Sequence, residues 1–532
     1  MTRIIGSMNS ADIANFDNVF AAELPADPAP ENSLRQVAGA AYSRVAPTPV
    51  SAPRLLGWSE EMGRELGIAR PAPGDAWLEA LAGNCLLPGM EPYAACYGGH
   101  QFGNWAGQLG DGRAISLGQI KTAAGRFWEL QLKGAGLTPY SRGADGRAVL
   151  RSSLREFLCS EAMHHLGIPT TRALSLVATG DEVVRDMFYD GNPQAEPGAI
   201  VCRVAPSFLR FGSFELPRSR EDETLLRLLA DHCIRWHFPD LDLAAPGVYA
   251  DWFAEVCRRS ADLVVDWMAV GFVHGVLNTD NMSVHGLTID YGPYGWLEPY
   301  DPAWTPNTTD AQGRRYCFGR QPQIVQWNLA RLGSALTPLV TDVETLQAGL
   351  EAFGSRYEQA FRSRFAAKLG LATWRGDDET LLNDLFKVLA MSEIDYCLFF
   401  RRLAQQADPA GSPDDLSALA PAFYAPETLE AAPGMALRDW LARFHQRLRD
   451  EARAPAERRR RMDAVNPKYV LRNYLAQQAI NAATEGDTGE LERLQQILRH
   501  PYDEQPEHEA YAGRRPEWAR HLPGCSALSC SS

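Results

Sequence analysis

The sequence has few cysteines, no long hydrophobic run and no signal-peptide pattern. Ten cysteines among 532 residues are too few for a disulfide scaffold, and eight are scattered singly, which is typical of buried thiols in a reducing compartment. No stretch approaches the roughly 18 uninterrupted apolar residues of a membrane span. The start, MTRIIGSMNSADIANFDNVF, has one Arg and no sustained apolar region. We therefore expect a cytoplasmic protein with no membrane partner.

Positive charge is also in deficit. The chain has 66 acidic and 52 basic residues, which gives a formal net charge of −14. A general nucleic-acid binder would have a basic surface, so a nucleic-acid polymer is not an expected partner. Hydrophobic content of 45% and charged content of 22% are those of an ordinary globular protein, and the length predicts two or three subdomains. A local basic site for a nucleoside triphosphate is compatible with this composition.

The composition changes along the chain in a definite order. Polar and Pro-rich segments come first, and we interpret them as an extension packed on a core. A glycine-rich, β-rich region with one helix at about 147–166 follows, then a strongly helical region, with 379–407 predicted as one helix, and a further helical part ending in a cysteine-containing tail. The predicted boundaries of these four parts are 1–92, 93–215, 216–425 and 426–532.

A strand that ends at Lys133 carries one half of a predicted ion pair. In the strand at 127–133, polar residues alternate with apolar ones, and Lys133 lies on the polar face. Alone, it would be an edge lysine in solvent. Glu156 lies twenty-three residues later, near the apolar stripe of the next helix, where a carboxylate is unfavourable unless it is paired. The expected partner is Lys133, as in kinases, although Arg151 and Arg155 are competing local partners.

Two later motifs resemble the metal-holding loops of protein kinases. Asn281 falls seven residues after His274, as the kinase Asn does, and Asp290 begins a D-Y-G sequence. Val276, however, occupies the position of the kinase base. Asn and Asp oxygens suit Mg²⁺ or Mn²⁺, and Asp280 is positioned to accept a proton from an incoming hydroxyl. We expect His274 to organise the loop.

Two glycine-containing turns and two arginines are candidate phosphate contacts. Gly110 and Gly112 lie in a G-D-G-R turn that includes Arg113, although such a turn also suits a plain hairpin. Asp145 and Gly146 precede the predicted helix, where Asp145 could instead be the helix cap. The remaining two candidates are Arg203 and Arg210. A guanidinium group can bind two phosphate oxygens at once, so both arginines are candidate phosphate contacts. The alternative is that each forms a salt bridge at the surface.

Several long motifs together resemble the selenoprotein O (YdiU) family of pseudokinase-like enzymes. The matching segments span nearly the whole chain and include YGGHQFGNWAGQLGDGRAISLG, LQLKGAGLTPYSRGADGRAVLRSSLREFLCSEAM, RVAPSFLRFGSFE, GFVHGVLNTDNMS and LTIDYGPYG. The resemblance implies an α+β, two-lobed protein-kinase-like fold, with a β-rich N-lobe, a helical C-lobe and terminal helical extensions. It also implies transfer of AMP from ATP to Ser, Thr or Tyr of protein substrates, with UMP transfer from UTP attributed to bacterial members.

The family resemblance also implies roles for individual residues. Asp280 would be the proton acceptor, Asn281 and Asp290 would bind metal, and Glu156 would orient Lys133. The expected ATP contacts are Gly110, Gly112, Arg113, Lys133, Asp145, Gly146, Arg203, Arg210 and Asp290. Two other functions stay open: a kinase that transfers the γ-phosphate with Asp280 as base, and a catalytically silent nucleotide-binding scaffold.

The C-terminal tail suggests a redox role. Some family members carry selenocysteine third from the C-terminus, where this chain has Cys530. Cys317 is the hypothetical disulfide partner, and Cys525 is the nearer competitor. The alternative is a tail with no pairing.

Overall fold

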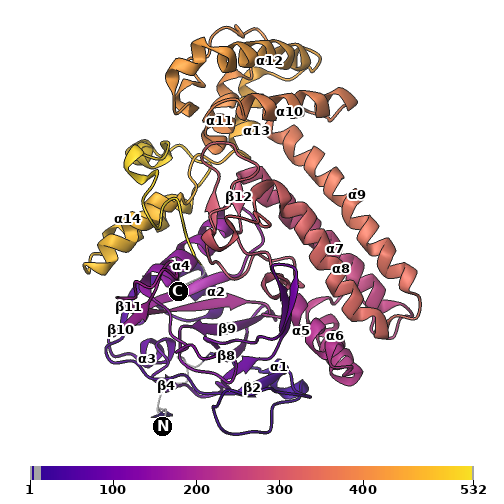
Figure 1. The fold of residues 1–532 in the computed structure, drawn as a ribbon, viewed down its shortest axis with the longest axis vertical. Helices are drawn as coiled ribbons and strands as arrows, with labels where there is room; N and C mark the ends of the chain where they lie inside the picture. Colours follow the sequence, from indigo (N-terminus) through magenta and orange to yellow (C-terminus); the bar gives the residue numbers. More distant parts are fainter. Residues whose placement is uncertain (1–2, 5–13, 530–532) are drawn as a thin grey trace.

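The protein is of the α+β class, with a β-sheet at one end and long helices leading away from it (Figure 1). The computed structural model describes residues 3–4 and 14–529. Within that part of the chain, no helix is long and apolar enough to cross a membrane.

The main sheet has seven strands, and the strand that ends at Lys133 lies in its middle. Every neighbouring pair is antiparallel. In spatial order the strands are β2 (Tyr42–Arg44), β5 (Tyr93–Ala95), β8 (Ala114–Lys121), β9 (Phe127–Lys133), β11 (Gln194–Ala205), β10 (Arg172–Arg185) and β3 (Arg54–Trp58). An edge lysine in solvent is therefore excluded, because β9 is covered by a strand on each side. The polar face of β9 is also buried: Glu129 and Gln131 have little or no exposed surface.

Residues before 93 contribute to the sheet itself. Strands β2 and β3 form its two edges, although they belong to the segment expected to be an extension. Short elements accompany them: β1 (Arg3–Ile4), α1 (Val19–Glu23), α2 (Glu60–Leu66), α3 (Ala76–Leu81) and β4 (Cys85–Leu86). The sequence missed the edge strands because they are only three and five residues long. The predicted boundary at 92 thus does not separate an independent layer from the sheet.

Helix α4 (Leu150–His165) packs against the sheet and carries Glu156 towards it. Its apolar stripe, which includes Leu154, Phe157 and Leu158, is fully buried against strands β10 and β11. Each such side chain stabilises the fold by about 1.5–3 kcal/mol. Gly57 of β3 has no side chain where the ring of Phe157 approaches, since a Cβ there would lie 2.7 Å from it. The helix is therefore held in one position relative to the sheet.

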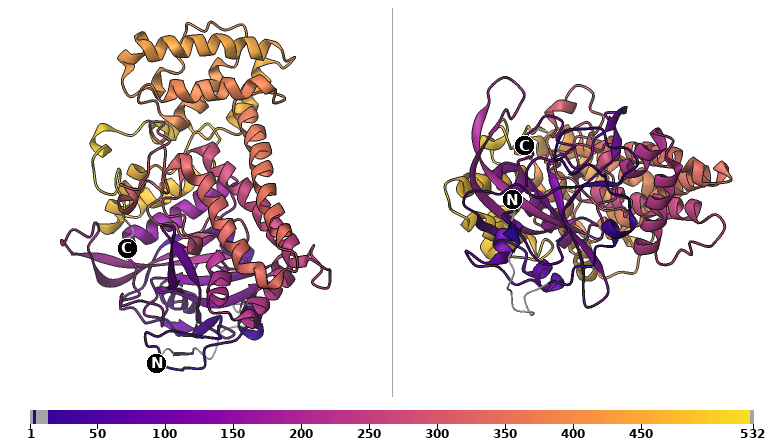
Figure 2. Two further views of the ribbon diagram at one scale, coloured as in Figure 1. Left: turned by 45° about the vertical axis from the view of Figure 1, so that its right-hand side comes forward. Right: turned by 90° about the horizontal axis from the view of Figure 1, so that it is seen from below.

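The remaining helices form a long helical region (Figure 2). They are α5 (Phe211–Ser219), α6 (Glu223–His237), α7 (Val248–Val270), α8 (Gln321–Leu336), α9 (Val343–Lys368), α10 (Gly376–Leu389), α11 (Tyr396–Leu403), α12 (Ala432–Arg449), α13 (Pro455–Asp463), α14 (Asn473–Thr484) and α15 (Gly489–Leu498). Helices α10 and α12 lie at the end of the molecule far from the sheet. The single helix predicted for 379–407 was wrong. The chain breaks between α10 and α11, where the buried carboxylate of Asp395 caps α11 and pairs with Arg472.

Two small antiparallel pairs place the loops of the site. Hairpin β6 (Gly98–Gln101) and β7 (Asn104–Gln108) packs on α5, and β12 (Phe272–Val273) pairs with β13 (Gly295–Trp296). Glycine is required in β6, because a Cβ on Gly98 would lie 2.8 Å from the carbonyl oxygen of Gly107. Between β12 and β13 the chain makes a 3₁₀ turn, η2 (Thr279–Asn281), which packs against β6. The two kinase-like loops are therefore fixed at the edge of the sheet.

Candidate functional site

The predicted site residues meet around one cavity of about 800 Å³ between the sheet and the η2 loop. Its size is in the range of small-molecule sites. Ten of the predicted residues line it: Gly110, Gly112, Arg113, Lys133, Asp145, Gly146, Arg203, Asp280, Asn281 and Asp290. Glu156 and Arg210 lie behind this lining and act on it through the side chains that they contact.

The predicted ion pair between strand and helix is present. Lys133 Nζ donates to Glu156 Oε2 at 2.5 Å. The competing partners are engaged elsewhere: Arg151 pairs with Glu196, and Arg155 donates to the carbonyl oxygen of Tyr294. Burial lowers the pKa of Lys133, and the Glu156 carboxylate opposes this shift. The ammonium group is thus held at the wall of the cavity by a partner that is itself shielded from solvent.

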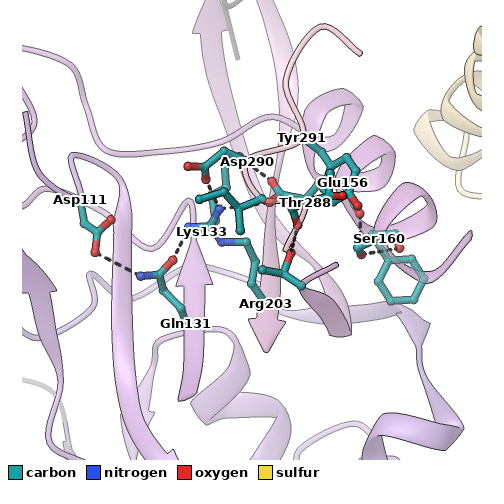
Figure 3. Close-up of polar contacts among 12 residues, drawn as sticks. Asp111, Gln131, Lys133, Glu156, Ser160, Arg203, Thr288, Asp290 and Tyr291 are labelled. Carbon is teal, nitrogen blue, oxygen red and sulfur yellow. Dashed lines mark hydrogen bonds and ion pairs between the residues drawn. The ribbon is translucent and has the colours of Figure 1, made fainter. Parts of the chain in front are cut away.

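Arg203 and Arg210 are buried against Asp290 and are not surface residues. Arg203 Nη1 donates to one oxygen of Asp290 (Figure 3), and Arg210 Nη1 donates to the other oxygen. Arg203 also contacts Glu156 at 3.2 Å, so the two carboxylates share one guanidinium. Burial alone would raise the pKa of Asp290, but the charges of Arg210, Arg203 and Lys133 hold it well below its usual range. Lys133, Arg203 and Arg210 thus face Glu156 and Asp290, and Arg210 also lies 4.0 Å from the buried carboxylate of Asp111.

The loop before Asp290 is fixed by His274. The buried imidazole Nε2 of His274 lies 2.8 Å from the carbonyl oxygen of Ile289, in agreement with an organising role. Asp290 itself has φ +57°, a conformation that few non-glycine residues adopt. Such strain of about 1–3 kcal/mol persists where surrounding contacts determine it, and here the two arginines do so. Asp290 is therefore aimed at the cavity by both its backbone and its partners.

Asp280 lines the cavity and has one carboxylate oxygen without a partner among the described residues. Gln101 Nε2 donates to Asp280 Oδ2 at 3.1 Å, whereas Oδ1 has no hydrogen-bond partner among residues 3–4 and 14–529 although it is shielded from solvent. Burial raises the pKa of Asp280 to about 6, against the opposing effects of Gln101 and Arg210. Gly99 makes room for this carboxylate, since a Cβ there would lie 2.7 Å from Oδ1. A buried, unpaired carboxylate oxygen at a cavity wall requires a ligand or a proton.

Asn281 and Asp290 fit a hard divalent cation. Asn281 Nδ2 donates to the carbonyl oxygen of Val276 at 3.0 Å, which leaves the amide oxygen as the remaining acceptor. Both oxygens of Asp290 accept from arginines but keep further lone pairs. These oxygen donors suit Mg²⁺ or Mn²⁺.

The two glycine turns lie at the opposite wall. Gly110 has φ +79°, and a Cβ on it would lie 2.5 Å from the ring of Tyr140, so only glycine fits. Gly146 is equally constrained by the carbonyl oxygen of Gly136, at 2.1 Å from such a Cβ. Burial lowers the pKa of Arg113, whose side chain lines the cavity between these turns. Backbone thus approaches the cavity closely at both turns.

The position of Asp145 relative to helix α4 was mispredicted. The helix begins at Leu150, and its N-cap residue is Val149, so Asp145 is not the cap and the 143–147 loop does not supply the first turn. Asp145 instead pairs with Arg185 of β10 and accepts from the backbone N–H of Arg147. An anion there would contact loop backbone, not a helix N-terminus.

Three polar residues of the site were not identified from the sequence. Gln131 Nε2 donates to Asp111 Oδ2 at 3.1 Å, and Gln131 Oε1 accepts from Arg203 (Figure 3). Burial raises the pKa of Asp111. The signal for Gln131 was available, because it shares a strand face with Lys133. The third residue, Gln101, had no local signal, because its contact with Asp280 spans 179 positions.

The C-terminal segment reaches the mouth of the cavity. Leu528 forms backbone hydrogen bonds with Pro306 and Thr308, Ser529 donates to the carbonyl oxygen of Met187, and both Leu528 and Ser529 line the cavity. Cys317 and Cys525 are buried free thiols, and burial raises the pKa of Cys525 to about 11. A Cys317–Cys525 disulfide is therefore absent. Cys530 lies outside the described residues, so its pairing stays a prediction.

The chain is similar to known proteins over nearly its whole length. Residues 29–499 match the family described as "Protein adenylyltransferase SelO". A protein nucleotidyltransferase YdiU of Nitrosospira multiformis is 59% identical over 545 residues, which covers 98% of this chain and 96% of that protein. Proteins of the same name from Methylobacillus flagellatus and Rhodopirellula baltica are 59% and 56% identical, each over 97% of this chain and 99% of their own length.

Proposed function

This chain belongs to the SelO family, and we propose that it is a protein adenylyltransferase that moves AMP from ATP to hydroxyl groups of other proteins. The acceptors would be Ser, Thr or Tyr side chains, and pyrophosphate would be released. One observation carries the proposal: the same cavity is lined by a cluster of cationic side chains and by Asp280, one of whose carboxylate oxygens has no partner among the described residues. The first suits a polyphosphate, and the second suits a hydroxyl that must lose a proton.

The cationic side of the cavity would bind the triphosphate. Lys133, held by Glu156, and Arg113 line the wall, where they would neutralise phosphate oxygens. Arg203 and Arg210 would act with Asp290, since each arginine is paired with that carboxylate. The loops that approach closely through Gly110, Gly112, Asp145 and Gly146 would supply backbone contacts.

Asp280 would be the general base. Its pKa of about 6 leaves it mostly ionised at neutral pH while it keeps substantial proton affinity. The acceptor hydroxyl oxygen would attack the α-phosphorus and form a new P–O bond as its proton passes to Asp280 Oδ1. The bond between the α-phosphorus and the bridging oxygen would break, and pyrophosphate would leave with the electron pair. Val276, at the position of the kinase base, has no polar side chain to take this role.

Asn281 and Asp290 would hold Mg²⁺ or Mn²⁺ through their oxygens. When bound, the ion would offset charge on the phosphates and on the departing pyrophosphate. Asp290 also pairs with Arg203 and Arg210, so the same carboxylate would connect the metal to the cationic wall. UTP is a second candidate nucleotide.

The order of elements supports a protein-kinase-like arrangement of two lobes. The antiparallel sheet with Lys133, helix α4 with Glu156 and the helical region with the η2 loop occur in the order found in kinases. We propose the cytoplasm as the location, since ATP is abundant there and the nine described cysteines are free thiols.

The proposal is tested by determining which phosphate of ATP is transferred to the protein substrate. The protein would be incubated with Mg²⁺ or Mn²⁺, candidate substrate proteins and ATP labelled at either the α- or the γ-phosphate, and the products would be analysed by mass spectrometry. We expect the α-label and the adenosine moiety on a hydroxyl side chain. Transfer of the γ-label would establish a kinase instead, and absence of any transfer with intact ATP binding would establish a silent scaffold.

A further inference from the structure

A surface of aromatic and basic side chains lies next to Asp280. It consists of Phe102 and Trp105 from the β6–β7 hairpin, Arg315 from the loop before α8, and Trp327 and Arg331 from α8; we name these residues the acceptor platform. Only Phe102 also lines the cavity, so the platform begins at the cavity and continues outside it.

The hairpin ties the platform directly to the η2 loop. Gln101 donates to Asp280, and the backbone N–H of the next residue, Phe102, donates to Asn278 Oδ1 at 3.2 Å and to the Tyr316 hydroxyl at 2.9 Å. Tyr316 in turn donates to Asn278 Oδ1 at 2.5 Å. Because these bonds join the hairpin, the η2 loop and the residue after Arg315, the platform has a fixed position relative to the proposed base.

The members of the platform are packed around Trp327. The guanidinium carbon of Arg315 lies 4.8 Å from the centre of the Trp327 ring, and that of Arg331 lies 5.1 Å from it. His100 contacts both tryptophans, with ring centres 5.5 Å from Trp327 and 5.2 Å from Trp105. Phe102 is 37% exposed and Trp105 is 38% exposed, so two large apolar side chains beside the cavity face solvent. Exposed clusters of this kind mark interaction sites.

Both arginines have guanidinium nitrogens without an acceptor. Within the described part of the chain, Arg315 Nε and Nη2 and Arg331 Nε have no hydrogen-bond partner, although these atoms are shielded from solvent. A guanidinium stays charged and can only donate, so buried unused donors favour an added acceptor. Two carboxylates near the platform already have hydrogen-bond partners. Glu215 contacts His100 Nδ1 at 2.6 Å, and Asp310, whose charge also interacts with that of Arg315, accepts from the backbone N–H groups of Arg315 and Tyr316.

We propose that the acceptor platform binds an acidic segment of the protein substrate, with a carboxylate on Arg315 and Arg331 and an adjacent apolar side chain on Phe102 and Trp105. This inference rests on the proposed function and extends it to the choice of substrate. The platform adjoins Asp280 through Gln101, so a segment bound there would place a nearby hydroxyl next to the base. The charge is complementary, because two arginines with unused donors meet carboxylates.

Peptide binding tests the platform independently of nucleotide transfer. Two fluorescein-labelled peptides would differ only in having Glu or Gln at the positions that flank a single Ser and a Leu, and fluorescence anisotropy would measure their affinity for the full-length protein. We expect about tenfold tighter binding of the Glu peptide, which corresponds to ~1.4 kcal/mol. Higher salt should reduce the difference, because charge screening acts on partly exposed pairs.

Variants identify the residues responsible. The double change Arg315→Ala with Arg331→Ala should abolish the preference for Glu, whereas Arg315→Lys should keep part of it. Arg315→Glu should favour a matching peptide with Lys. The control is Arg459→Ala, whose exposed side chain lies on α13, away from the sheet. Thermal melting of each variant checks folding.

Equal affinity for the two peptides, or a preference that survives loss of both arginines, would overturn the proposal. Tighter, Arg315-dependent binding of an RNA oligonucleotide would also overturn it, because the partner would then be a different macromolecule. Transfer of labelled AMP is measured separately. An acidic preference without transfer would contradict only the proposed function, and transfer without that preference would contradict only this inference.

Discussion

The buried pair between Lys133 and Glu156 makes the most direct test of the site. We consider Glu156→Gln, which keeps the shape of the side chain and removes its charge. Glu156 is 1% exposed and accepts from Lys133 Nζ at 2.5 Å and from Arg203 Nη1 at 3.2 Å. In the wild type, Lys133 and Arg203 both contact this carboxylate. In the variant they lose its negative charge, so the buried cluster carries one more uncompensated positive charge.

The expected loss of stability follows from this uncompensated charge. Removing one partner of a buried ion pair generally destabilises a protein by about 3–5 kcal/mol. Since the pair is shielded from solvent, the loss should persist at high salt, unlike that of a surface pair. Differential scanning fluorimetry should show a lower melting temperature in both low and high salt. The control is Glu485→Gln, at an exposed position at the C-terminal end of α14. Its melting temperature should equal that of the wild type.

The same variant should lose activity by misplacing Lys133. Displacement of a positioning group by about 1 Å can reduce a rate roughly a hundredfold, and we expect a loss of that order in AMP transfer. Adding Lys133→Met to Glu156→Gln should recover part of the stability but no activity, because the extra charge is removed while the phosphate contact is not restored. The reasoning is refuted if Glu156→Gln alone retains wild-type melting and wild-type transfer.

Three further predictions concern other buried positions. Asp280→Asn should lower the rate of AMP transfer by about 10²–10⁴-fold with little change in ATP affinity, measured by calorimetry; undiminished transfer would exclude Asp280 as the base. Gly99→Ala should also slow transfer without changing any charge, since its Cβ would lie 2.7 Å from Asp280 Oδ1. The control for transfer rate is Gly354→Ala on α9, where a Cβ would meet no atom within 4 Å. Burial lowers the pKa of Lys368 to about 7, below its value in the unfolded chain. Above pH 7 the unfolded state therefore binds more protons than the folded state. The free energy of unfolding should rise between about pH 7 and 10, by at most ~1.4 kcal/mol per pH unit. This rise should be absent in Lys368→Met, compared by urea unfolding at each pH, and an identical pH dependence in both proteins would contradict the assignment.

Local sequence patterns were sufficient for most elements and for the principal residues of the site. The alternation that ends at Lys133 and the helical stripe around Glu156 predicted a strand and a helix, and the structure pairs these two side chains. This prediction worked because a buried carboxylate needs a partner, and the nearer candidates Arg151 and Arg155 are engaged by other acceptors. The spacing from His274 to Asn281 and Asp290 similarly identified two loops that line the cavity.

Partner choice among the charged groups could not be predicted in the same way. Arg203 and Arg210 were expected either at phosphates or at the surface, whereas both are buried on Asp290. The sequence offers each guanidinium group several possible acceptors. Which acceptor is buried beside it is decided only when distant segments pack together. The two edge strands β2 and β3 were missed for a related reason, because strands this short have too few residues to show a period.

The sequence by itself determined the family, most of the strands and helices, and most of the residues that line the cavity, since these depend on local patterns and long motifs. Tertiary structure alone decided the environment of those residues. It brought Gln101 to Asp280 across 179 positions and left the other carboxylate oxygen without a partner. It also placed Leu528 at the mouth of the cavity. The physical reason is that desolvation and hydrogen-bond partners depend on contacts between distant segments, which local periodicity does not encode.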